Sequence, residues 1–71
     1  MAREMRLVDV QRLLRSRCEA AGGQRRFAET HGLAVAYVSQ VLHGSRPPSA
    51  KLCKALGIKS DGERWVATSA R

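Results

Sequence analysis

The stretch from Gln24 to His43, QRRFAETHGLAVAYVSQVLH, constrains the fold of this chain more than any other part of its sequence. Its apolar residues recur at three- and four-residue spacing on both sides of Gly32, which indicates two short amphipathic helices. Glycine readily adopts the left-handed conformation that ends a helix, and the small Ala28 lets two helices pack closely. We therefore predict helices over about 24–31 and 35–43, joined by a tight turn.

Further helices are predicted on both sides of this pair. Apolar residues at helical spacing cover residues 6–21, and the pair Gly22-Gly23 follows as a stop signal. Downstream, Ser49 is a good N-cap for a helix over 50–56, which Gly57 would end. The fold class expected from these segments is all-α.

The tail, residues 59–71, has a different composition. Its residues 60–62, Ser-Asp-Gly, favour a turn, and residues 63–68, ERWVAT, have the composition of a strand. Trp65 and Val66 would point to opposite sides of that strand, so it needs a cover: the helical core or the same strand of a second copy. We predict that Trp65 and Val66 form a dimerisation segment; the alternative is a tail with Trp65 folded onto the core.

The length and charge of the chain limit its function. Its 71 residues make one domain, which buries only about 60% of its unfolded surface, so a homodimer would help its stability. Thirteen Lys and Arg against six Asp and Glu give a net charge of +7, which favours a polyanion such as nucleic acid or an anionic membrane surface. The chain shows neither a long apolar run nor a signal-peptide core, so we expect a cytoplasmic protein that does not span a membrane.

The residues that usually carry catalysis or bind metals are few and scattered. Cys18 and Cys53 lack the spacing of a zinc site or redox motif, so free thiols in helices are expected. His31 and His43 belong to no pattern that indicates a catalytic triad, and the chain has no Gly-rich phosphate loop. We therefore expect no enzyme activity, no metal or other cofactor and no small-molecule substrate.

The helix predicted over 35–43 has one arc that carries no charge, which we call the reading face. No Lys or Arg occurs between Phe27 and Ser45, although the chain is strongly basic. Neutral side chains on a helix can meet base edges in a DNA groove while basic groups on either side hold phosphates. The reading face consists of Val35, Ala36, Ser39, Gln40 and His43.

Candidate phosphate contacts flank the reading face in the sequence. Gln24 and Arg25 lie in the first turn of their helix, where backbone amides attract anions. Arg46 follows the second helix in a turn stiffened by two prolines. Lys51 either contacts DNA or is simply a solvated surface residue.

The sequence QRRFAETHGLAVAYVSQVLHGSRPPSAKLCKALGI, from Gln24 to Ile58, resembles helix-turn-helix regulators of the Cro and lambda-repressor type, especially small phage or prophage regulators. The resemblance lies in Gln24 at the start, Ala28 at the helix crossing, Gly32 in the turn and the run YVSQVLHG before a basic turn. It implies a compact lambda-repressor-like domain of four or five helices with a short C-terminal extension. Such domains commonly bind double-stranded operator DNA as dimers, with the second helix of the motif in the major groove.

The resemblance also assigns roles to residues. It implies phosphate contact by Tyr37 in addition to Gln24, Arg25 and Arg46, and base reading by the reading face. Two positions depart from the family pattern: Ala34 stands where relatives often have a capping Ser or Thr, and Val35 where they often have a polar residue. A missing N-cap costs about 1 kcal/mol.

The function expected from these observations is that of a sequence-specific DNA-binding transcriptional regulator, a repressor that occupies operator DNA. The alternative is an antitoxin or phage accessory protein that keeps the helix-turn-helix as a scaffold and binds a partner protein through its tail. RNA binding is a weaker third option, because Tyr37 and Trp65 lie too far apart in the sequence to indicate a stacking platform.

Overall fold

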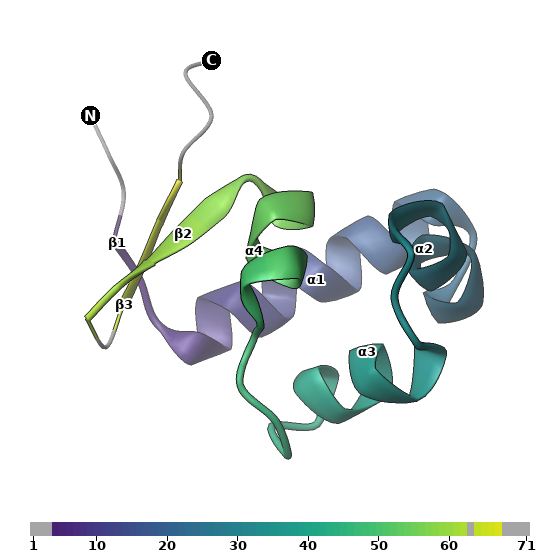
Figure 1. Ribbon diagram of the computed structural model, residues 1–71, viewed down its shortest axis with the longest axis horizontal. Helices are drawn as coiled ribbons and strands as arrows, with labels where there is room; N and C mark the ends of the chain where they lie inside the picture. The colour runs from purple at the N-terminus through teal and green to yellow at the C-terminus, as the bar shows by residue number, and fades with distance from the viewer. Residues whose placement is uncertain (1–3, 63, 68–71) are drawn as a thin grey trace.

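A computed structural model describes residues 4–62 and 64–67 of the chain (Figure 1). The described residues form four helices and three strands packed as one domain. In chain order these are β1 (Glu4–Met5), α1 (Leu7–Ala21), α2 (Gln24–His31), α3 (Val35–Leu42), α4 (Ala50–Leu56), β2 (Ile58–Asp61) and β3 (Arg64–Ala67).

The helices begin and end where the local sequence signals predicted. Gly32 has φ 66° and ends α2, and Gly57 has φ 73° and ends α4, so both glycines adopt the left-handed conformation. The Oγ of Ser49 accepts a hydrogen bond from the amide of Leu52 at 3.3 Å and caps α4. The predicted pair of helices joined by a tight turn is thus confirmed, with α3 ending one residue earlier than expected, at Leu42.

The strands form a small antiparallel sheet in the order β1-β3-β2, so the described residues are mostly helical, as expected, but not strictly all-α. Glu4 pairs with Val66 in β3, and Lys59 in β2 pairs with Val66 from the other side. The predicted turn at 60–62 is also shifted, because residues 60 and 61 belong to β2. Of the predicted strand over 63–68, residues 64–67 form β3, and Glu63 and Thr68 lie outside the described residues.

The core lies between α1, the helix pair, α4 and the sheet (Figure 1). Trp65 is half-buried and packs against this core, and Val66 is buried in the sheet, at 9% exposure. Both sides of β3 are paired within the chain, so direct pairing of β3 with the β3 of a second copy, as predicted for the tail, is wrong. The buried hydrophobic cluster consists of Val10, Leu14, Cys18, Phe27, Ala28, Val38, Val41, Leu42, Leu52, Cys53, Leu56 and Ile58.

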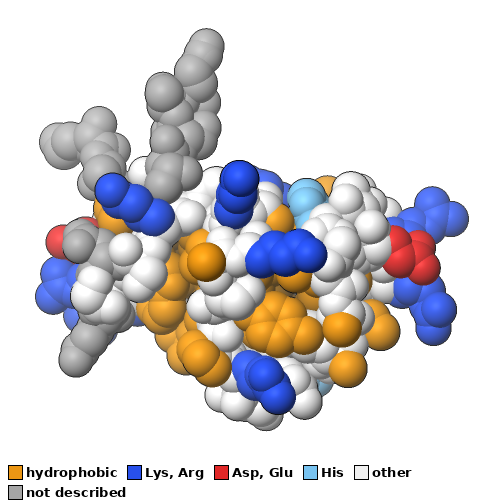
Figure 2. Space-filling view, in the orientation of Figure 1, with side chains coloured by type: hydrophobic (Ala, Val, Ile, Leu, Met, Phe, Trp, Pro, Cys, Tyr) orange, Lys and Arg blue, Asp and Glu red, His pale blue; other side chains and the backbone are white. Residues whose placement is uncertain are grey.

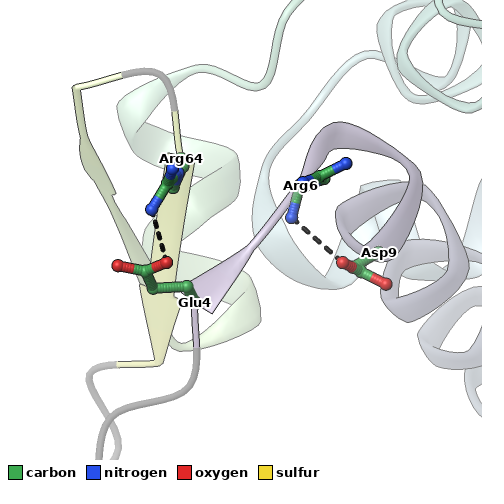
Figure 3. A network of polar contacts seen from close by, with 4 residues as sticks. All are labelled: Glu4, Arg6, Asp9 and Arg64. Carbon is green, nitrogen blue, oxygen red and sulfur yellow. Dashed lines mark hydrogen bonds and ion pairs between the residues drawn. The ribbon is translucent and has the colours of Figure 1, made fainter.

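Polar contacts fasten the N-terminal strand to its neighbours (Figure 3). The Arg64 guanidinium donates to Glu4 Oε1 at 2.6 Å and links β3 to β1. The backbone amide of Arg6, the N-cap of α1, donates to Asp9 Oδ2 at 3.0 Å, which satisfies one of the amides that have no partner within the helix. Both partners of the ion pair are exposed, so it contributes at most about 1 kcal/mol. Backbone pairing and packing of the sheet on the core therefore hold β1 in place.

Candidate nucleic-acid interface

The two sides of α3 differ in burial. Val38, Val41 and Leu42 are buried against the core. On the other side Ala36, Gln40 and His43 are exposed, Ser39 is half-buried, and Val35 is exposed to 41%, which is high for a large apolar side chain. The five residues of the predicted reading face therefore lie on the outer side of a helix whose inner side is fixed.

A side chain of α1 holds the C-terminal end of α3. Gln11 Nε2 donates to the backbone oxygen of Val41 at 3.2 Å. A Cβ on Gly44 would lie a tight 3.3 Å from the same nitrogen, and Gly44 has φ 81°, a conformation that other residues rarely adopt, so both favour glycine after His43. Sequence reasoning missed Gln11, because a half-buried polar residue in a helix gives no local sign of a partner 30 residues away.

Tyr37 fastens the segment between α3 and α4, which differs from its predicted role. Its hydroxyl donates to the backbone oxygen of Pro47 at 3.1 Å and accepts from the amide of Ser49 at 2.6 Å. A phosphate oxygen needs a donor, and the one proton of this hydroxyl is used by Pro47. Tyr37 is therefore not a free phosphate donor here. It instead holds the chain on both sides of the prolines against α3 and fixes the base of the turn that carries Arg46.

The predicted phosphate contacts at the start of α2 are accessible. Gln24 and Arg25 are exposed, and Gly23, the N-cap, offers no side chain to the first amides of the helix. Arg46 is exposed in the turn after α3. In the face that Figure 2 shows, Lys and Arg side chains lie at both ends of the molecule and around its apolar surface. Backbone donors and guanidinium groups thus lie on either side of α3 in the chain.

Lys51 contacts the turn of the helix pair. Its Nζ donates to the backbone oxygen of Gly32 at 2.7 Å, so it ties α4 to the connection between α2 and α3. An ammonium group has three donors, so two remain for other partners. Of the two predicted alternatives for Lys51, DNA contact or plain solvation, neither described this contact with the backbone.

A hydrogen bond orients the ring of His43. Its Nδ1 lies 2.8 Å from the backbone oxygen of Ser39 and 3.4 Å from Ser39 Oγ. A carbonyl oxygen only accepts, so Nδ1 must carry the proton that makes the shorter bond. In the neutral ring Nε2 is then an acceptor, and it is the ring nitrogen left for an external group.

Backbone amides at the start of α3 have no side-chain cap in the described part of the chain. Ala34 is the N-cap, with an extended backbone at φ −76° and ψ 134°, and its methyl group cannot accept a hydrogen bond. Its carbonyl accepts the amide of Val38 at 3.1 Å, as the first bond of the helix. The amides of residues 35 to 37 thus remain available to water or to an anion.

The remaining chemistry of the described residues is limited. Cys18 and Cys53 are free thiols buried in the core, as predicted. Burial raises the pKa of both, helped at Cys18 by the charge of Glu19 and opposed at Cys53 by a hydrogen bond with Trp65. The described residues contain no group of three or more side chains that could hold a metal ion and no helix long and apolar enough to cross a membrane.

Comparisons with protein-family models, curated proteins and solved structures gave no match to this chain.

Proposed function

We propose that this protein is a sequence-specific DNA-binding regulator that represses transcription by occupying operator DNA. The observation that carries the proposal is α3, a helix with its apolar side buried and an exposed, uncharged reading face on its other side. Enzymes need convergent reactive groups, and an exposed neutral helix face offers none. Such a face suits the major groove of DNA, where base edges present donors, acceptors and methyl groups.

Gln40 is the main base reader in this proposal. Its side chain is exposed, and among the described residues no protein group hydrogen-bonds its amide. A Gln amide can both donate to adenine N7 and accept from adenine N6. Val35 and Ala36, exposed one turn earlier on α3, would contact thymine methyl groups, which makes apolar residues useful at the start of this helix.

Groups outside the reading face hold the DNA backbone. Arg25 and the uncapped amides of α2 would contact phosphates on one side, and Arg46 phosphates on the other. Gln11, Tyr37 and Lys51 do not contact DNA in this scheme. They fix α3 and the turns beside it, so that base and phosphate contacts keep one register.

The test is selection of bound sequences from random DNA at a stated salt concentration, followed by binding of variants to the selected site. Enrichment of one sequence is expected, and a palindrome would also indicate a two-fold dimer. Gln40→Ala should lose about 1–3 kcal/mol of discrimination at one base pair. Arg46→Ala should weaken binding to all sequences and reduce the salt slope by about one.

The matched control for Arg46→Ala is Lys59→Ala, which removes the same charge from β2, at the end of the molecule away from α2 and α3 (Figure 1). It should change affinity much less than Arg46→Ala. The proposal is wrong if no sequence is enriched, or if Gln40→Ala weakens binding to operator and random DNA equally.

A further inference from the structure

The sheet has an open edge at β2. Because β3 lies between β1 and β2, the outer side of β2 pairs with no strand among the described residues. The pair Asp61–Arg64 closes the hairpin and is a hydrogen-bonded pair. Along an antiparallel ladder hydrogen-bonded and non-hydrogen-bonded pairs alternate, so Ser60 and Ile58 fall in non-hydrogen-bonded pairs with β3. The backbone groups of Ile58 and Ser60 therefore point outward, where they can bind another extended chain.

A groove runs beside this edge, between α4 and β2. Its volume is about 330 Å³, near the lower end of ligand sites, which suits a few side chains better than a large cofactor. Buried Cys53 and Ile58, each 4% exposed, contribute its apolar wall, and Lys54 and Lys59 are exposed beside it. The complete lining is Ala50, Cys53, Lys54, Ile58, Lys59 and Ser60.

We propose that the outer edge of β2 binds an extended acidic segment of a partner protein, which adds to the sheet as a fourth strand. Main-chain bonds would come from Ile58 and Ser60, and alternate side chains of the segment would enter the groove. Carboxylates of the segment would meet the ammonium groups of Lys54 and Lys59.

Charge selects this occupant over a second copy of the chain. A second copy would bring its own Lys54 and Lys59 to the interface, on a protein whose net charge is already +7. An acidic strand meets the same lysines with opposite charge. β2 lies at the end of the molecule away from α2 (Figure 1), and none of the proposed contacts on β2 and α4 is one proposed for DNA.

The test uses the full chain and two fluorescent peptides of about eight residues, one alternating Val and Glu and the other alternating Val and Lys. Saturable binding of the Glu peptide is expected, at least about tenfold tighter than binding of the Lys peptide. Amide NMR signals of β2 and α4 should shift, while those of α3 should not. Ser60→Pro, which removes one outward amide and none that pairs with β3, should weaken binding while Trp65 fluorescence stays unchanged.

Two charge-reversal pairs provide matched variants. Lys54→Glu with Lys59→Glu should abolish binding of the Glu peptide. The double variant Arg25→Glu with Arg26→Glu changes the net charge by the same amount, on exposed residues of α2, and should still bind the Glu peptide. Under the proposed function this variant loses DNA binding. The inference is overturned by equal affinity for the two peptides, by NMR shifts confined to α3, by equal losses in both variant pairs, or by self-association through β2 in sedimentation experiments.

Discussion

Ala34 offers a direct test of how α3 begins and what it approaches. The N-cap positions of α3 and α4 have similar extended backbones, with φ −76° and ψ 134° at Ala34 and φ −82° and ψ 168° at Ser49. Ser49 caps its helix by accepting the amide three residues later. A serine at position 34 should reach the amide of Tyr37 in the same way, so we predict that Ala34→Ser stabilises the protein.

The size of the effect is that of a typical N-cap. An N-cap hydroxyl contributes about 0.5–2 kcal/mol, typically about 1 kcal/mol. In a domain of this length that raises the melting temperature by about 4–8 °C per kcal/mol. Ser49→Ala should lower the melting temperature by a similar amount. Ala36→Ser is the matched control, because it adds the same hydroxyl to α3 beyond the N-cap and should not stabilise the fold.

An aspartate at position 34 separates stability from DNA contact. Its carboxylate also caps the helix and suits the positive end of the helix dipole, so Ala34→Asp should raise the melting temperature as well. In the proposed complex this position lies next to Val35, which contacts the bases, so the added negative charge would lie close to the DNA and should weaken binding to operator and random DNA alike. Thermal denaturation measures the first effect, and fluorescence anisotropy at several salt concentrations measures the second.

The stability effect and the binding effect at position 34 are tested separately. If Ala34→Ser leaves both the melting temperature and the hydrogen exchange of the first amides of α3 unchanged, the start of the helix is not limited by its cap. If Ala34→Asp binds DNA as tightly as Ala34→Ser, the start of α3 does not approach DNA and the proposed docking is wrong.

Three further predictions concern other parts of the structure. Tyr37→Phe removes two hydrogen bonds at a partly exposed position, so the free energy of unfolding should fall by about 1–2 kcal/mol. DNA affinity should fall equally for all sequences, and a loss confined to one base pair would contradict this. His43→Ala should remove selection for an adenine or cytosine amino group at one position, as read by repeated DNA selection; an unchanged site would contradict it. Burial raises the pKa of the Cys18 and Cys53 thiols in the folded state, so the folded state holds their protons more tightly than the unfolded state does. The free energy of unfolding in denaturant titrations should therefore fall as pH rises above about 8.5, and should fall less steeply when both residues are alanine. An equal dependence on pH in the two proteins would contradict this.

Local sequence signals predicted the helices, but they did not predict β1 or the pairing of the sheet, because its strands lie far apart in the sequence. Gly32, Ser49 and Gly57 each mark a helix end within a few residues, so the limits of α2 and α4 could be read from the sequence. The two residues of β1 show no periodicity, and the partner of Glu4 is Val66, near the other end of the chain. A strand whose pairing spans the chain has no local pattern that could predict it.

The same distinction holds for the candidate site. The outward position of the reading face follows from helical spacing alone, and the structure confirms it. The contacts of Tyr37 with Pro47 and of Lys51 with Gly32 depend on how α3, α4 and the turns pack. Family resemblance treats Tyr37 as a phosphate contact, but packing gives its hydroxyl a partner in the protein.

Because the sheet forms within one chain, a dimer is not needed to cover the C-terminal strand. Sequence reasoning offered two covers for Trp65 and Val66, the helical core or a second copy, and β1, β2 and the core cover them within one chain. Removal of the residues after Ile58 would take away β3 and most of β2, and with them the cover that the sheet gives the core, so the remaining helices should lose stability. If the protein does pair on DNA, the reason is the spacing of two half-sites one helical turn apart and not the completion of a fold. A monomer that melts cooperatively, at a temperature independent of protein concentration, would agree with this view, whereas a melting temperature that rises with concentration would show that folding depends on assembly.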